Sequence, residues 1–233
     1  MSRRAEVNHR RFAEETAKTV NPSTILVVAL GSTEQHGPHL PLSTDTIVAE
    51  ALVGYLCETD PRFSFGPTFS VGASGEHAGF TGTLSIGTEA LSTLLVELVR
   101  SARDACSEVY FVSGHGGNLD AVQGAVSLSA SEGDRVGAFF SGVRGGDVHA
   151  GRTETSLLLH LAPHLVVPPF VVGNVQPLDE LLSALEQGGT ASVSPNGILG
   201  DPRGATAREG EQLFAQMSGR LVAHARKWLG DAS

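Results

Sequence analysis

Short apolar runs alternate along this chain with stretches in which apolar residues recur at helical spacing. Runs rich in β-branched and aromatic residues predict buried strands over residues 24–30 (TILVVAL), 109–112 (VYFV) and 135–141 (RVGAFFS). Helical periodicity predicts helices over residues 44–56, 89–105, 119–130, 154–161 and 206–229. This alternation predicts an α/β fold with a mainly parallel sheet. Because no linker or internal repeat divides residues 1–233, we expect a single domain, whose residues 1–20 form a polar leader.

The overall charge excludes some classes of partner. The 233 residues carry 25 Asp and Glu against 16 Lys and Arg, a formal net charge of −9, which argues against nucleic acid as a partner. We expect no membrane partner and a cytoplasmic location, since no apolar run approaches the ~18 residues of a membrane span and the start of the chain lacks the apolar region of a secretory signal. The two cysteines, Cys57 and Cys106, lie in apolar stretches and are predicted to be buried, inert thiols.

Polar, glycine-flanked segments follow the first two predicted strands. Residues 31–45 (GSTEQHGPHLPLSTD) contain Glu34, His36 and Asp45, and residues 113–118 (SGHGGN) contain His115. Ligands of open parallel sheets bind at the carboxyl ends of the strands, so these segments are the first candidates for a site. Imidazoles with carboxylates are the ligand set expected for Zn, Mn or Fe, and a shared carboxylate is how two-metal hydrolases hold a pair of ions.

A third segment, residues 147–156 (DVHAGRTETS), adds a histidine and an acid at the start of a predicted helix. Glu154 would supply a further oxygen ligand, and His149 is either a ligand or a proton-transfer group. Each residue also has an ordinary structural role open to it, because loop histidines are often only solvated and Asp45 could simply cap its helix. Convergence of three such segments favours the metal site.

Residues 72–77 (GASGEH) predict a loop that projects Ser74, Glu76 and His77 toward a pocket, or a turn whose polar groups satisfy one another. A serine nucleophile is a poor interpretation, because the G-x-S-x-G pattern would need glycine where Glu76 stands. Residues 114–118 are a weak match to a phosphate loop, since they lack the lysine and do not fit G-x-G-x-x-G. We assign Ser74, Glu76, His77 and Asn118 to substrate binding.

Taken together and in this order, the motifs GSTEQHGPHLPLSTD, GASGEHAGFTGT, SGHGGN, HAGRTETS and GDPRGAT resemble the creatininase family of metal-dependent amidohydrolases, over roughly residues 24–217. The resemblance implies a three-layer αβα fold and two divalent metal ions per subunit, with Asp45 as the bridging ligand and His149 as the catalytic histidine. The metal ligands that it implies are Glu34, His36, Asp45, His115 and Glu154. Creatinine-hydrolysing members carry a glutamate ligand where Gly117 stands, and Glu154 is expected to fill that vacancy.

Within the family, residues 72–91 and 194–210 look most like members that process a short ribosomal precursor peptide. This resemblance implies a peptidase that removes a C-terminal Val-Tyr dipeptide from the modified precursor, and a homo-oligomer, a hexamer or smaller. Two alternatives remain open: hydrolysis of a small cyclic amide such as creatinine or of a formamide, and a non-catalytic, metal-stabilised binding protein. The choice among Zn, Fe and Mn also remains open, because the ligand set suits all three.

Overall fold

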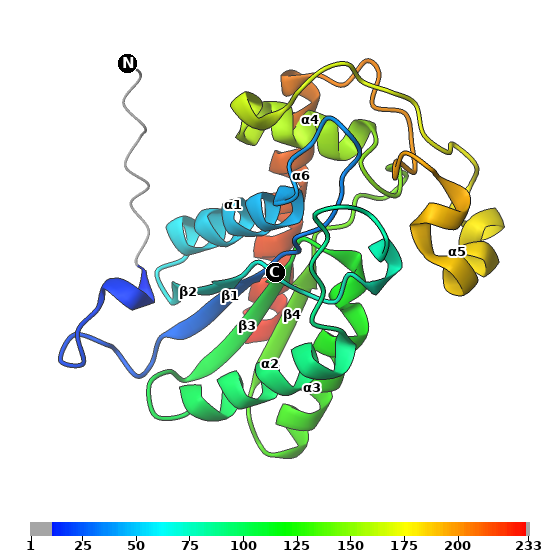
Figure 1. The fold of residues 1–233 in the computed structure, drawn as a ribbon. Helices are drawn as coiled ribbons and strands as arrows, with labels where there is room; N and C mark the ends of the chain where they lie inside the picture. Colours follow the sequence, from blue (N-terminus) through cyan, green and yellow to red (C-terminus); the bar gives the residue numbers. More distant parts are fainter. Residues whose placement is uncertain (1–10, 232–233) are drawn as a thin grey trace.

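The computed structural model describes residues 11–231 and contains a four-stranded sheet in which every neighbouring pair of strands is parallel. The strands lie in the order β2 (Phe63–Phe69), β1 (Ile25–Leu30), β3 (Glu108–Ser113) and β4 (Val136–Phe140), as Figure 1 shows. The first ten residues of the expected polar leader lie outside the described residues. The prediction of a single domain over residues 1–233 stays a prediction.

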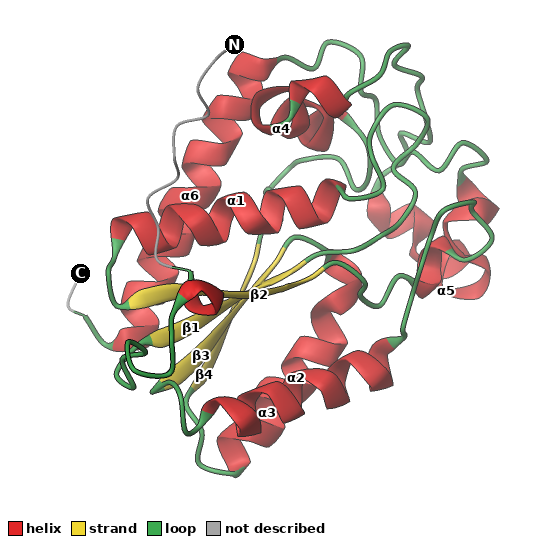
Figure 2. Cartoon of the chain, turned by 60° about the vertical axis from the view of Figure 1, so that its left-hand side comes forward, coloured by secondary structure: helices red, strands yellow, loops and turns green. Residues whose placement is uncertain are grey.

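Helices cover both faces of the sheet (Figure 2). One face carries α1 (Thr44–Thr59), α4 (Arg152–Leu161) and α6 (Ala207–Leu229), and the other carries α2 (Thr88–Ala102) and α3 (Leu119–Ser131). Alternate residues of β1 divide between these two cores, with Val27 in the first and Val28 in the second, so the strand is buried on both sides. The predicted three-layer αβα sandwich with a parallel sheet is therefore confirmed.

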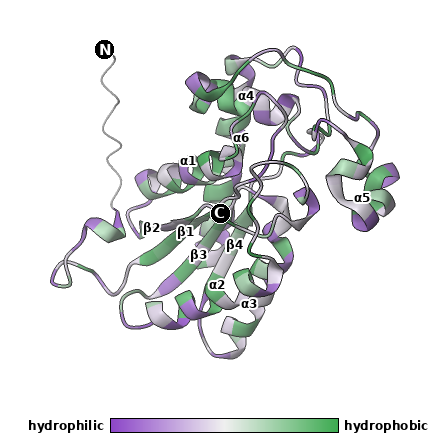
Figure 3. Cartoon of the chain, viewed as in Figure 1, coloured by the Kyte–Doolittle hydropathy of each residue, from purple (hydrophilic) through white to green (hydrophobic). Residues whose placement is uncertain are grey.

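Within residues 11–231, four short 3-10 helices complete the regular structure, at Phe12–Glu14, Gly75–His77, Gly116–Asn118 and Pro163–Leu165. Hydropathy along the ribbon, in Figure 3, is highest on the strands and on the helix faces that meet them. Both cysteines are free and buried, as predicted, and burial raises the pKa of the Cys57 thiol to about 12. Among the described helices, none is long and apolar enough to cross a membrane.

The sequence patterns predicted three of the four strands and missed β2 and α5 (Leu178–Val193). Gly66 and Pro67 interrupt the apolar pattern of β2, and the pairing with β1 shifts register at this point. Proline is tolerated there because β2 is an edge strand. Gly189 has a non-helical backbone inside α5, a helix that lies beside the layered sandwich rather than within it (Figure 1). The predicted helix over residues 89–105 ends earlier, at Ala102.

The strand order creates a switch point, since the connections after β1 and β3 lead to opposite sides of the sheet. Leu30 pairs with Ser113, so the polar loops that follow these strands leave the sheet side by side. A Cβ atom at Gly31 would overlap with Thr46, and one at Gly114 would overlap with the backbone of Asp45. Only glycine at these two positions lets the start of α1 pack directly on the strand ends, which brings Asp45 between the two loops.

Candidate metal centre and active site

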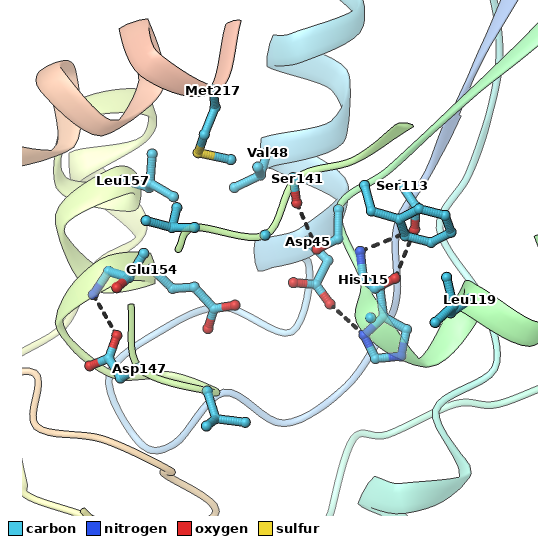
Figure 4. A pocket seen from close by; sticks show the side chains of 17 residues that line it. Asp45, Val48, Ser113, His115, Leu119, Ser141, Asp147, Glu154, Leu157 and Met217 are labelled. Atoms are coloured by element: carbon cyan, nitrogen blue, oxygen red, sulfur yellow. Dashed lines mark hydrogen bonds and ion pairs between the residues drawn. The ribbon is translucent and has the colours of Figure 1, made fainter. Parts of the chain in front are cut away.

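Asp45 is the centre of a buried cluster at this switch point. Its Oδ1 lies 3.3 Å from His36 Nε2 and its Oδ2 lies 3.1 Å from His115 Nδ1. Figure 4 shows its carboxylate between His115 and Glu154. Glu34 Oε2 lies 3.3 Å from His115 Nε2, and Glu154 Oε2 lies 3.9 Å from His36 Nε2. The structure thus brings all five predicted ligands together.

These side chains form two overlapping groups that share Asp45. One group consists of Glu34, Asp45 and His115, and the other of His36, Asp45 and Glu154. Within each group, the possible ligand atoms all lie within 4.8 Å of one another. Two ligand sets joined by a single carboxylate are the arrangement that two-metal hydrolases use.

Glu34 provides a test of whether a cation fits this cluster. Its side chain is fully buried, and neither carboxylate oxygen has a hydrogen-bond partner. A buried carboxylate without hydrogen bonds is costly, and coordination of a divalent cation would satisfy both oxygens. Imidazole nitrogens and carboxylate oxygens suit Zn, Mn and Fe. The residues present therefore fit a divalent metal centre.

The charged groups of the cluster shift one another's pKa values. Burial, with the nearby charge of Asp45, raises the pKa of Glu34 to about 8. Burial alone would lower the pKa of His36, but the carboxylates of Asp45, Glu154 and Glu34 together outweigh burial and raise this pKa to about 9. Burial would raise the pKa of Asp45, but His36 and His115 hold it well below its usual range. Without a cation, the cluster therefore retains protons at neutral pH.

His149 lies against the Glu34 side of the cluster. Its Nδ1 is 3.8 Å from Glu34 Oε1, and its ring centroid is 4.3 Å from those of both His36 and His77. Burial, together with the neighbouring His36 and His77, lowers the pKa of His149 well below its usual range. A neutral imidazole in this position can accept a proton or ligate a metal ion.

A cavity of about 300 Å³ adjoins the cluster. Asp45, His115 and Glu154 form part of its wall (Figure 4). Most of the remaining wall is apolar, made by Val48, Leu119, Phe140, Val143, Leu157 and Met217. An apolar side chain placed in this cavity would lie directly beside the candidate metal ligands.

Ser74, Glu76 and His77 contact the cluster from outside that cavity. Glu76 Oε1 lies 3.2 Å and Ser74 Oγ 3.5 Å from His115 Nε2, and His77 Nε2 lies 3.5 Å from Glu34 Oε1. None of the three is among the residues that line the 300 Å³ cavity. Their contacts support the side chains of the cluster, while the Glu76 side chain remains 38% exposed.

Asn118 occupies a different kind of position from the one predicted. It is fully buried; its side-chain oxygen accepts a hydrogen bond from the Ala73 amide at 3.0 Å, and its nitrogen donates one to the Gly31 carbonyl at 3.0 Å. These bonds tie the loops after β1 and β3 to the residue 72–77 segment. Asn118 therefore positions loops, and it is not among the residues that line the 300 Å³ cavity. Its assignment to substrate binding stays a prediction.

Three residues near the cluster were not found by sequence reasoning. Ser32 Oγ donates to Asp45 Oδ2 at 2.7 Å, and Asp147 accepts hydrogen bonds from the backbone amides of Arg152 and Thr153 at the start of α4. Gln35 contacts two of the buried histidines. All three lie in the motifs already singled out, but a hydroxyl, an amide or a helix-capping carboxylate carries no metal signature in a sequence.

Comparison with known proteins agrees with this geometry. The family model described as "Creatinine amidohydrolase" matches residues 10–225. Over 218 residues the chain is 48% identical to the "Mycofactocin precursor peptide peptidase" of Mycobacterium ulcerans, covering 89% of this chain and 87% of that relative. The protein of that name from Mycolicibacterium smegmatis is 48% identical over 213 residues, covering 89% and 86%.

Solved structures show the same fold. A crystal structure of creatinine amidohydrolase (creatininase) superimposes with a TM-score of 0.73 at 20% identity, covering 97% of this chain and 100% of that one. The structure described as "Creatininase Mn" gives a TM-score of 0.72 at 20% identity and covers 94% and 98%. From the match of the family model over nearly the whole chain and the two relatives at 48% identity, this chain belongs to the creatininase family.

Proposed function

We propose that this chain is a metal-dependent peptidase that cleaves the mycofactocin precursor peptide. The observation that carries the proposal is the pair of ligand groups joined by Asp45, beside an apolar cavity of about 300 Å³. The relatives named mycofactocin precursor peptide peptidase support the choice of substrate, since they share 48% of residues over most of the chain. Release of a C-terminal Val-Tyr dipeptide, which the family resemblance implies, is part of the proposal.

The ligands named above would hold two divalent ions, with Asp45 shared between them. Ions at such a centre supply Lewis acidity, which polarises the scissile carbonyl and lowers the pKa of water. The chain itself excludes bulk water, since Glu34, His36 and Asp45 are 0%, 0% and 3% exposed. We assign proton transfer to His149: its Nδ1 takes a proton from the attacking water and passes that proton to the leaving nitrogen. Such a step is typically worth ~10² to 10⁴ in rate.

The cavity supports a peptide substrate with an aliphatic or aromatic side chain at the cleaved bond. Its apolar wall matches valine or tyrosine, and the lining also has polar groups, on Ser113, Ser141, Asp147 and Thr153. Small amides such as creatinine or formamides would leave much of this apolar wall without contact. Peptide cleavage is therefore the function that the geometry supports best, and the smaller amides serve as comparison substrates.

The test uses the full chain purified without added metal. Elemental analysis identifies the bound metal among Zn, Fe and Mn, and hydrolysis is measured with a precursor peptide ending in Val-Tyr, with creatinine and with formamides. We expect His149→Ala to keep its metal and lose ~10² to 10⁴ in kcat, because only the proton-transfer group is removed. Asp45→Ala should lose both metal and activity.

The exposed His164, in the 3-10 turn after α4, offers a control: His164→Ala should leave metal content and turnover unchanged. An Asp45→Ala variant with full metal content and full turnover would show that Asp45 does not join two ions. Hydrolysis of creatinine in preference to the peptide would overturn the substrate. A homo-oligomeric assembly and a cytoplasmic location, expected above, remain part of the proposal.

A further inference from the structure

Gln35 lies between two candidate ligands in the sequence, but its side chain points at other partners. The Oε1 atom accepts a hydrogen bond from the Gly37 amide at 2.9 Å, and Nε2 donates one to the Gly197 carbonyl at 2.9 Å. Neither backbone partner can exchange its role, because an amide nitrogen only donates and a carbonyl oxygen only accepts. The side-chain amide of Gln35 is therefore held in one orientation.

The second hydrogen on Gln35 Nε2 is directed at His77. The distance from Gln35 Nε2 to His77 Nδ1 is 2.9 Å, and the Gln35 nitrogen can only donate. His77 Nδ1 must then accept, so the hydrogen of the neutral imidazole is on Nε2. That Nε2 atom faces Glu34 Oε1 at 3.5 Å.

The backbone of Gln35 makes the corresponding contact with His149. The Gln35 carbonyl oxygen lies 2.8 Å from His149 Nε2 and can only accept, so Nε2 donates and carries the hydrogen. The side-chain nitrogen of Gln35 is also 3.1 Å from His149 Nε2, but its two hydrogens are already directed at Gly197 and His77. His149 Nδ1 therefore carries no hydrogen, and it faces Glu34 Oε1.

We propose that Gln35 is a positioning residue that holds both His77 and His149 as Nε2–H tautomers and so gives them opposite roles. His77 directs its hydrogen at Glu34 and cannot ligate an ion through Nε2. His149 presents a free lone pair at Nδ1 to the same carboxylate. The inference bears on one candidate group of metal-binding side chains, because it excludes Glu34, Glu76 and His77 as an ion site that uses His77 Nε2.

The two tautomers follow from the hydrogen bonds of Gln35 alone. Only their use in proton transfer rests on the proposed function. Residues that orient the ligands of a metal centre typically change its metal affinity by ~10- to 100-fold when they are replaced. Loss of the Gln35 amide should therefore be visible in two ways, as a change of tautomer at His77 and as weaker binding of metal by the cluster.

The test is ¹H–¹⁵N correlation NMR of the zinc-loaded full chain with labelled histidines, which distinguishes hydrogens on Nδ1 from those on Nε2. We expect both His77 and His149 in the Nε2–H form, with resonances assigned by their loss in His77→Asn and His149→Ala. Gln35→Glu keeps an acceptor for Gly37 but places a second acceptor against His77, so His77 should change to the Nδ1–H form. His149 should not change, because the backbone carbonyl of residue 35 remains.

Zinc affinity measured on the same Gln35→Glu variant should fall by ~10- to 100-fold. The exposed Gln123 supplies the control, since Gln123→Glu makes the same change of charge on the surface of α3 and should alter neither readout. An Nδ1–H form of His77 in the unmodified chain would overturn the proposal. So would a Gln35→Glu variant in which His77 keeps its tautomer.

A second variant displaces the amide without changing residue 35. A Cβ atom at Gly197, where φ is +78°, would overlap with Gln35 Oε1, so Gly197→Ala should release the His77 tautomer as well. Gly133→Ala is matched for backbone strain, since φ is +93° there, and its Cβ would meet no heavy atom within 4 Å. Both tautomers as assigned, with no hydrolysis of any amide, would support the role of Gln35 while contradicting the proposed function.

Discussion

Two buried carboxylates of the candidate metal centre, Asp45 and Glu34, differ sharply in their partners. Asp45 accepts a hydrogen bond from Ser32 and faces two imidazoles, which hold its pKa well below the usual range against the effect of burial. Glu34 has no hydrogen-bond partner for either oxygen, and burial raises its pKa to about 8. Without a metal, Asp45 is therefore ionised at pH 7 while Glu34 and His36, with a pKa of about 9, hold protons.

Metal binding should therefore release protons. Ligands bind as carboxylate and neutral imidazole, so at pH 7 the loss of protons from Glu34 and His36 opposes binding. Apparent zinc affinity should rise as pH increases from 7 toward 9, since the pKa values of Glu34 and His36 in the folded chain are about 8 and about 9. Calorimetric titration in two buffers with different ionisation enthalpies counts the protons. His115, whose pKa Asp45 and Glu76 hold well above its usual value against the effect of burial, also loses a proton, and burial raises the pKa of Glu154 to about 7. We therefore expect roughly three or more protons at pH 7 and fewer at pH 9.

The control for this prediction is the His164→Ala variant, which removes an exposed histidine and should give the same proton count as the unmodified chain. An affinity that does not change between pH 7 and pH 9, with no proton released at pH 7, would mean that Glu34 and His36 are not both ligands.

Among the helices and strands, those with an uninterrupted apolar run or helical periodicity could be predicted from the sequence. Strands β1, β3 and β4 are continuous apolar runs, and α1, α2, α3, α4 and α6 show helical periodicity, so the sequence predicts them. The edge strand β2 and the kinked α5 carry Gly and Pro interruptions that tertiary packing overrides. The candidate ligands could be predicted because acids and imidazoles follow strand ends. The role of Gln35 could not, since it depends on Gly197, far away in the sequence.

Helix α6 packs closely on α4 at Gly210, so a larger residue at that position should destabilise the fold. A Cβ atom at Gly210 in α6 would overlap with the Ser156 carbonyl of α4, and α4 carries Glu154 at its start. Gly210→Ala should force the two helices apart and cost ~1 to 3 kcal/mol of unfolding free energy, the usual effect of overpacking. Urea unfolding of the metal-free chain measures this directly.

Gly219 in the same helix is the matched control. Its Cβ would meet nothing within 4 Å, so Gly219→Ala should stabilise the chain by up to ~1 kcal/mol through helix propensity alone. If both variants changed the free energy of unfolding equally and in the same direction, the contact between α4 and α6 would be looser than the structure indicates.

At the scale of the whole molecule, the candidate ligands join connections that are distant in the sequence. Glu34 and His36 follow β1, Asp45 begins α1, His115 follows β3 and Glu154 lies in α4. Helix α4 lies in a helical layer, whereas the loops follow the carboxyl ends of β1 and β3. Ions held by all of these residues would therefore connect that helical layer to the ends of the central strands. Bound metal should therefore stabilise the fold as well as the site.

Removal of metal should lower the melting temperature of the whole chain. A ligand that binds only the folded state stabilises it by ~4 kcal/mol when its free concentration is about 1,000 times Kd. Scanning calorimetry with increasing zinc should show a Tm that rises with zinc concentration, and excess EDTA should reverse the rise. Asp45→Asn removes the shared carboxylate charge with little change of volume, so its Tm should respond only weakly to zinc or EDTA. A zinc-dependent Tm retained in full by Asp45→Asn would show that binding of the stabilising ion does not depend on the Asp45 carboxylate.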